Sequence, residues 1–319
     1  MKGKPLSDSL SVEDAHSEQQ ASIHGSHTPN LLVVGGDSTI GSQLFRAAQV
    51  RGLDVHKTSR LDPSAENTWA LELGDESSSL TLLRAAKDHG VTDAVVTIGQ
   101  SSFISCADEP NATRHINVTL TQQFVKALVG IEVNVMVISS GAVFSGRNWC
   151  PTEESVCDPE TEYGRQKVEL EDAVLSYEGT RVVRFSKVLS SNNELWRQWI
   201  HRIQSGEKVQ AFGNVKVSPL GISAAVSAIV RQLEVPAGRI VHISPTDEVT
   251  YVDAVKLMAQ EMKLPVNLES LNVQCDVNRG ILPYRHTALG TVLPDTNLKI
   301  GSSESAVRMF THQVVDSSM

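Results

Sequence analysis

The chain has 319 residues, of which 40% are hydrophobic and 20% are charged, an ordinary composition for a folded globular protein. Its formal net charge of -9 argues against a nucleic-acid partner, because binding to a phosphate backbone needs a clustered excess of Lys and Arg. No apolar run approaches the roughly 20 residues that span a bilayer. We therefore expect neither a nucleic-acid nor a membrane partner.

Residues 1–29 are polar throughout and lack the apolar core of a signal peptide. They predict a disordered N-terminal extension on a cytoplasmic protein. The cysteines contain no CxxC pair and no histidine cluster at zinc spacing, which indicates reduced thiols and no metal site. The four are Cys106, Cys150, Cys157 and Cys275.

From residue 31 onwards, short β-rich runs alternate with helical periods. Strands are expected at 31–35, 53–59, 93–99, 133–140 and 180–189, and helices near 40–51, 77–89, 113–129 and 162–177. This alternation predicts an α/β fold with a doubly wound, parallel Rossmann sheet.

The regular alternation weakens after residue 190. Helices are expected near 193–205, 222–233 and 250–262, with a Gly/Pro-marked stretch at 211–221 and a strand at 239–244. We expect residues 30–190 to form an NAD(P)-binding Rossmann domain. Residues 191–319 are expected to form a smaller α/β substrate-binding subdomain that is partly interleaved with it.

The first strand runs into the turn GGDSTIG, in which Gly35 and Gly41 occupy the first and third positions of a GxxGxxG pattern and Ser38 the second. A strand that turns directly into a helix presents free backbone N–H groups and the positive end of the helix dipole, which stabilise a phosphate. An ordinary strand-turn-helix junction is the alternative. The predicted pyrophosphate-binding residues are Gly35, Asp37, Ser38, Thr39, Ile40 and Gly41.

The second strand ends in Lys57, Thr58, Ser59 and Arg60 rather than in the acidic residue that usually binds an unphosphorylated ribose. This cluster favours NADP(H) over NAD(H), although basic residues after a strand are often only solvated. Further along, Asp75 is expected either to reach the adenine or to cap the following helix. Gly99, at the end of a predicted strand, is expected to contact the cofactor as well.

Tyr163 and Lys167 lie four residues apart on a predicted helix, which places them one turn apart on the same face. An ammonium beside a phenol lowers the pKa of the tyrosine, so that it can exchange a proton with a carbonyl oxygen while a nicotinamide exchanges hydride. Ser140, at the end of a predicted strand, supplies a hydroxyl that orients this oxygen. A surface pair on the helix is the alternative interpretation.

Six segments resemble the extended short-chain dehydrogenase/reductase family, and the resemblance covers nearly everything from about residue 30 to 315. They are VVGGDSTIG, CADEPNATRHINV, VISSGAVFSG, PTEESVCDPETEYGRQKVELE, VVRFS and VSPLGIS. The resemblance implies a Rossmann domain, a substrate domain and a catalytic set of Ser140, Tyr163 and Lys167. It also implies that Asn117 helps to order the site.

Within this family, the compact C-terminal part and the segment RHTALGT are most similar to dTDP-4-dehydrorhamnose reductase and related sugar-nucleotide reductases. The similarity implies that a 4-keto sugar linked to a nucleotide is reduced by NADPH while the tyrosine donates a proton, and family habit suggests a homodimer. The chain departs from the family at Gly141 and Ala142, where an Asp-Tyr pair is usual, and at Lys187, where a Trp is usual. Lys187 is either a partner for an anionic group of the substrate or a solvated lysine.

Two other functions remain open. The segment SSGAVFSG also resembles sugar-nucleotide epimerases, and the irregular glycine turn is compatible with a non-catalytic NADP-binding regulatory subunit such as that of methionine adenosyltransferase. Substrate contacts are expected from the backbone of residues 99–102, from Arg184 and Ser218, and from the loop before His286. Ser218 is alternatively part of a structural turn, and His286 a buried core histidine.

Overall fold

The computed structural model of the chain describes residues 29–274, 286–293 and 300–317. Three of the predicted features lie outside these residues: the N-terminal extension up to residue 28, Cys275, and the loop before His286. Cys106, Cys150 and Cys157 are free thiols. Within the described ranges, no helix has the length and hydropathy needed to cross a membrane.

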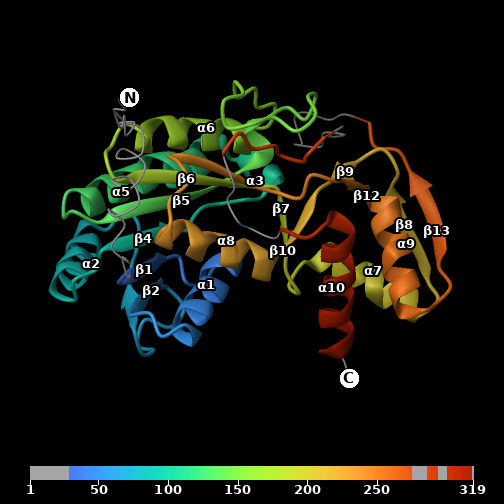
Figure 1. Ribbon diagram of the computed structural model, residues 1–319, viewed down its shortest axis with the longest axis horizontal. Coiled ribbons are helices and arrows are strands. Elements are labelled where there is room, and N and C mark those ends of the chain that lie inside the picture. The colour runs from blue at the N-terminus through green and yellow to red at the C-terminus, as the bar shows by residue number, and fades with distance from the viewer. Residues whose placement is uncertain (1–28, 275–285, 294–299, 318–319) are drawn as a thin grey trace, which may run out of the picture.

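Seven parallel strands form the central sheet, in the spatial order β11-β6-β5-β4-β1-β2-β3 (Figure 1). They are β1 (Leu31–Val34), β2 (Val55–Ser59), β3 (Thr68–Ala70), β4 (Asp93–Val96), β5 (Asn134–Ser140), β6 (Thr180–Phe185) and β11 (Ile240–Ile243). The winding reverses between β1 and β4, which opens a crevice at the carboxyl ends of these strands. The predicted doubly wound Rossmann fold is therefore confirmed.

Helices cover both faces of this sheet and bury two hydrophobic cores. One face carries α1 (Thr39–Val50) and α8 (Ile222–Glu234), and the other carries α2 (Glu76–Asp88), α5 (Thr121–Val129) and α6 (Glu162–Val174). The strands β1 and β4 are buried along their whole length, as expected for parallel strands covered on both sides.

The predicted helix over 113–129 is divided into several segments. These are the end of α4 (Pro110–Arg114), the π-helical turn η1 (His115–Leu120) and α5. A further short helix, α3 (Phe103–Asp108), precedes them and was not predicted. Pro110 stands in the first turn of α4, where its missing N–H leaves no hydrogen bond unmade. The predicted strand over 180–189 is likewise interrupted at Ser186, so that β6 stays in the main sheet and β7 (Lys187–Leu189) leaves it.

A second unit lies beside the main sheet, at the right of Figure 1. It contains α7 (Glu194–Gln204), β8 (Lys208–Phe212), β9 (Lys216–Val217), β12 (Val249–Thr250), α9 (Tyr251–Met262), β13 (Asn267–Leu271) and α10 (Ser303–Asp316). Its core is built around Trp196 and Trp199, whose rings lie 5.7 Å apart. The strand β10 (Pro219–Gly221) pairs with β7, after which α8 and β11 return the chain to the main sheet.

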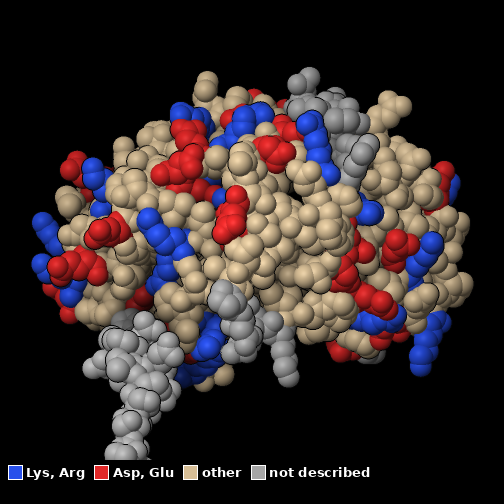
Figure 2. Space-filling view, turned by 45° about the horizontal axis from the view of Figure 1, so that its top comes forward, with Lys and Arg blue, Asp and Glu red and all other residues tan. Residues whose placement is uncertain are grey.

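Charged side chains of both signs are interspersed on the face shown in Figure 2. The most buried ion pair joins Arg184 on β6 to Glu171 on α6, with an N···O distance of 2.6 Å and both side chains almost fully buried. Glu171 also accepts a hydrogen bond from the Ser139 hydroxyl. The prediction that Arg184 contacts substrate is therefore wrong, because its guanidinium is sequestered between the helix and the sheet.

We expect Glu171→Leu to destabilise the fold by about 3–5 kcal/mol, because it leaves the Arg184 charge buried without its partner. The double variant Glu171→Leu/Arg184→Met should lose much less, since neither charge then remains. Urea unfolding of the wild type and the three variants of this cycle measures the difference. A loss in the double variant equal to the sum of the two single losses would show that the pair is not coupled.

Candidate active site

The turn after β1 has the backbone geometry that a phosphate-binding loop needs. Gly35 has a positive φ of 93°, and a Cβ at Gly41 would overlap the carbonyl oxygen of Gly35. Ser38 caps α1: its hydroxyl accepts a hydrogen bond from the Gly41 N–H at 3.0 Å and lies 2.8 Å from the Thr97 hydroxyl. The serine at the second glycine position thus closes the turn at the N-terminus of a helix, where anions are stabilised.

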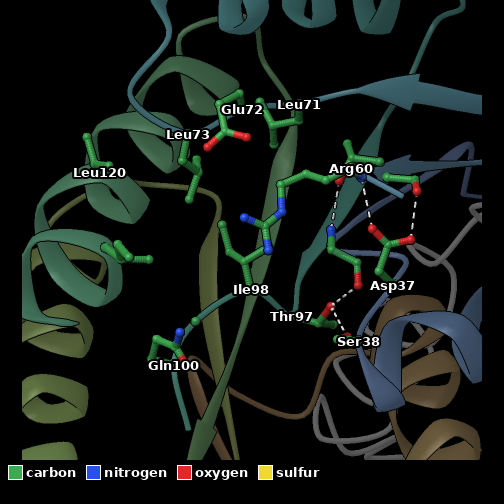
Figure 3. A pocket seen from close by; sticks show the side chains of 15 residues that line it. Asp37, Ser38, Arg60, Leu71, Glu72, Leu73, Thr97, Ile98, Gln100 and Leu120 are labelled. Atoms are coloured by element: carbon green, nitrogen blue, oxygen red, sulfur yellow. Dashed lines mark hydrogen bonds between the residues drawn. The ribbon is translucent and has the colours of Figure 1, made fainter. Parts of the chain in front are cut away.

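The second strand brings its polar end against this turn (Figure 3). The Ser59 hydroxyl and the Arg60 N–H donate to the Asp37 carboxylate at 2.7 and 2.9 Å. Burial alone would raise the pKa of Asp37, but these hydrogen bonds and the nearby Lys57 hold it below its usual value. The end of β2 itself carries no acidic residue, but Asp37 of the turn places a carboxylate at this point.

The Arg60 side chain extends into a cavity of about 350 Å³ beside Ile98 (Figure 3). The cavity is lined by the turn, the ends of β2 and β4, and part of the π-helical segment. Its residues are Gly35, Asp37, Ser38, Thr58, Ser59, Arg60, Leu71, Glu72, Leu73, Thr97, Ile98, Gly99, Gln100, Ile116 and Leu120.

Asp75 caps α2, and its carboxylate accepts a hydrogen bond from the Ser77 N–H at 3.0 Å. The helix-cap interpretation of this residue is confirmed. Asp75 lines an adjoining open hollow together with Ser59, Arg60 and Glu72, whereas the acidic residues of the cavity beside β4 are Asp37 and Glu72. Contact with an adenine stays a prediction.

Tyr163 and Ser140 line a second cavity of about 310 Å³, on the other side of Gly99. Thr39, Ile40 and Lys167 line it as well. The Ser140 hydroxyl accepts a hydrogen bond from the Ala142 N–H at 3.2 Å, at the start of the short 3-10 turn η2 (Gly141–Val143).

Lys167 lies on α6 one turn after Tyr163, with its ammonium 5.7 Å from the centre of the tyrosine ring. The ammonium donates to the carbonyl oxygen of Ile138 at 3.0 Å. Burial lowers the pKa of Lys167 to about 8, which Glu171 opposes. Lys167 is therefore a buried cation that stays largely protonated at neutral pH.

Asn117 orders the loop that separates the two cavities. It sits in the π-helical turn, a feature often found at functional sites, and its side chain exchanges hydrogen bonds with both backbone groups of Gln100. Its amide also donates to Gln166 of α6 at 2.7 Å. Gly99 has a φ of 136°, and a Cβ there would lie 2.9 Å from the Asn117 side-chain oxygen.

A third cavity of about 260 Å³ continues from Ser140 and Tyr163 towards the second unit. It includes Lys187, Tyr251 and His286, and His286 Nδ1 lies 3.2 Å from a Glu248 carboxylate oxygen. Neighbouring cavities share lining residues, so the three form one groove. Ser38 and Gly99 belong to the first two cavities, and Ser140 and Tyr163 to the last two.

Ser218 does not contribute to this groove. It has no exposed surface, and its hydroxyl donates to the carbonyl oxygen of Pro245 at 3.0 Å. The prediction that Ser218 contacts substrate is wrong, because Ser218 is buried between β9 and β10 and bonded within the chain. Residues 99–101 line the groove, while the Ser102 hydroxyl caps α3.

Several lining residues were not predicted from the sequence, among them Thr97, Ile98 and Tyr251. Thr97 follows the buried strand β4, so its place at a carboxyl strand end was a usable signal. Tyr251 carried no such signal, because only the packing of α9 brings it near Tyr163.

A family model described as the RmlD substrate binding domain matches residues 29–275, most of the length of the chain. The chain belongs to this family. A search of curated protein sequences finds no match.

Solved structures of this family and of related enzymes share the fold at low sequence identity. A dTDP-4-dehydrorhamnose reductase from Bacillus anthracis, in complex with NADP, superposes with a TM-score of 0.76 at 14% identity, over 91% of this chain and 99% of that one. A UDP-glucose 4-epimerase from Thermotoga maritima, with UDP-glucose, reaches 0.76 at 17% identity, over 91% and 99%. A hypothetical dTDP-4-dehydrorhamnose reductase from Sulfolobus tokodaii reaches 0.71 at 19% identity, over 85% and 95%.

Replacing Lys167 with Met should raise the free energy of unfolding by about 3 kcal/mol at pH 7. The native pKa of Lys167, about 8, lies below the ordinary value of 10.5, so the unfolded chain binds this proton more readily. The advantage of the variant should disappear as the pH rises from about 8 to 10.5, where both states become neutral. Urea unfolding at several pH values measures it, with the exposed Lys126→Met as control. A pH-independent difference would contradict the buried-cation assignment.

Proposed function

We propose that the protein is an NADP(H)-dependent oxidoreductase that reduces a carbonyl on a nucleotide-linked sugar. The observation that carries this proposal is the continuity of the groove. A phosphate-binding turn at one end and the Ser140, Tyr163 and Lys167 side chains further along line cavities that share residues. The family assignment and the NADP complex of a reductase with the same fold support it.

The residues of the first two cavities suit a dinucleotide. The N–H groups of Thr39 and Ile40, which have no hydrogen-bond partner among the described residues, would hold the pyrophosphate at the start of α1, and the Arg60 guanidinium would face the adenosine with its 2′-phosphate. Thr39, Ile40 and Gly99 would border the nicotinamide near Tyr163. When bound, this cofactor supplies a hydride to the carbonyl carbon.

Tyr163 is the proton donor in this proposal. Its phenol lines the cavities on both sides of Ser140, where a carbonyl oxygen would accept a hydrogen bond from the serine hydroxyl. The Lys167 ammonium, held on the Ile138 carbonyl, stabilises the phenolate that remains after proton transfer. Asn117 acts as a positioning residue, since it fixes the loop at Gln100 through two hydrogen bonds.

A sugar-nucleotide epimerase is the second candidate. The epimerase from Thermotoga maritima shares the fold with the same TM-score as the reductase. In addition, the Asp37 carboxylate engages Ser59 and Arg60, the groups that a 2′-phosphate would use. An epimerase would interconvert two sugars with no net consumption of reduced cofactor, so stoichiometric oxidation of NADPH separates the two candidates.

Two variants test the cofactor preference. Arg60→Ala should weaken NADPH binding about tenfold and NADH binding much less, because only NADPH carries the phosphate that this guanidinium would pair with. Asp37→Asn should strengthen NADPH binding roughly threefold or more, because it removes a negative charge beside that phosphate. Fluorescence titration of both cofactors measures these shifts, with the exposed Arg46→Ala as control. Equal effects of Arg60→Ala on NADPH and NADH would contradict the assignment.

Turnover tests the function itself. We expect the protein to oxidise NADPH in the presence of at least one nucleotide-linked 4-keto sugar, and Tyr163→Phe to lower the rate by about 10²–10⁴ with unchanged cofactor affinity. Absorbance of the reduced nicotinamide follows the reaction. Tyr177→Phe is the matched control, because its hydroxyl bonds Gln122 outside the groove. Tight NADPH binding without turnover of any such sugar would support the non-catalytic alternative and contradict the proposal.

A further inference from the structure

The third cavity of the groove is mostly apolar and aromatic. It begins at Ser140 and Tyr163 and ends against α9 of the second unit. Most of its lining comes from Phe103, Gly141, Ala142, Phe144, Phe185, Val215, Val217 and Tyr251. Whatever binds here lies on the far side of Tyr163 from the phosphate-binding turn.

Lys187 is the one Lys, Arg, Asp or Glu among the described residues that line this cavity. Its surroundings lower the pKa of its ammonium through burial alone. Within the described ranges no carboxylate forms an ion pair with it, and the nearby Glu248 is engaged by His286 and by the N–H groups of Thr287 and Ala288. The described part of the chain therefore keeps a cation at this wall and gives it no counter-ion.

Two hydroxyls of the same lining are also without a partner. The oxygen atoms of Ser186, beside Lys187, and of Thr287 are buried and form no hydrogen bond with any described residue. Buried hydroxyls are normally paired, because leaving them unpaired costs stability. Together with Lys187 they give this apolar cavity one positive charge and two hydrogen-bonding groups.

We propose that the substrate carries a carboxylate on its sugar and that Lys187 binds it, with Ser186 and Thr287 available for neighbouring sugar oxygens. The inference rests on the proposed function, which places the reacting carbonyl at Ser140 and Tyr163. Groups that occupy the third cavity must then belong to the reacting sugar, while the diphosphate of the nucleotide lies outside it. A single lysine matches the single charge of a carboxylate, whereas a phosphate usually takes more donors.

Binding of three related ligands tests this inference without requiring turnover. Calorimetric titration of the NADP⁺-loaded protein compares UDP, UDP-glucose and UDP-glucuronate, with thymidine-linked forms in parallel. UDP-glucose and UDP-glucuronate differ only at C6 of the sugar, which is a hydroxymethyl group in the first and a carboxylate in the second. We expect the glucuronate to bind about tenfold more tightly than the glucose form, the contribution typical of a charge-assisted hydrogen bond.

Lys187→Met should remove this preference. We expect it to weaken the binding of UDP-glucuronate about tenfold and the binding of UDP-glucose and UDP less than about twofold. Lys187→Arg should keep most of the preference. Lys256→Met, an exposed lysine of α9 outside the cavity, is the matched control. Unchanged NADP⁺ affinity in Lys187→Met verifies that the variant is folded.

The other outcomes each overturn a specific statement. If the wild type binds UDP-glucose and UDP-glucuronate equally well, the inference that the substrate carries a carboxylate is overturned, while the proposed function stays intact. Equal weakening of all three ligands in Lys187→Met, UDP included, shows that Lys187 binds the diphosphate and overturns the inference as well. Failure of every nucleotide and nucleotide sugar to bind the NADP⁺-loaded protein overturns the proposed function together with it.

Discussion

The contact between α6 and the end of β5 decides where the polar residues of the groove lie. A Cβ at Gly164 would overlap the carbonyl oxygen of Ala142, so only glycine lets the helix approach this closely. The approach brings Tyr163 and Ser140 to the same cavity. It also lets the Lys167 ammonium reach the carbonyl oxygen of Ile138, which lies two residues before Ser140 in β5. A larger residue at position 164 would move the tyrosine away from the strand end on which the proposed chemistry depends.

The same helix contributes to the stability of the sheet through the opposite end of its buried face. Glu171, one turn beyond Lys167, holds Arg184 of β6 and the Ser139 hydroxyl of β5. Lys167 and Glu171 therefore lie on the same face of α6. The interactions that bind α6 to β5 and β6 thus also hold the proposed catalytic residues in place. Asn117 extends this arrangement, since its amide joins Gln166 of α6 to the loop at Gln100.

The fold could be predicted because its buried parallel strands follow from local patterns. The turn before α1 and the Tyr163–Lys167 pair could be found in the same way, from a glycine turn before a helix and a spacing of one helical turn. Contacts between distant segments could not be predicted. The bond of Asp37 to Ser59 and Arg60 arises only when β1 and β2 pair, and it changes the electrostatics of the cluster that the sequence presents as purely basic. Arg184 and Ser218 are polar residues near strand ends that proved to be buried and internally paired.

We propose that one groove holds a dinucleotide at the turn and a reacting sugar at Tyr163. A crystal structure of the complex with NADP⁺ tests it most directly. We expect the pyrophosphate on the N–H groups of the turn at Gly35–Gly41, the adenosine phosphate at Arg60, and the nicotinamide between Ile40 and Tyr163, with the cavity at Lys187 left open. A cofactor bound elsewhere, or one whose nicotinamide lies away from Ser140 and Tyr163, would contradict it.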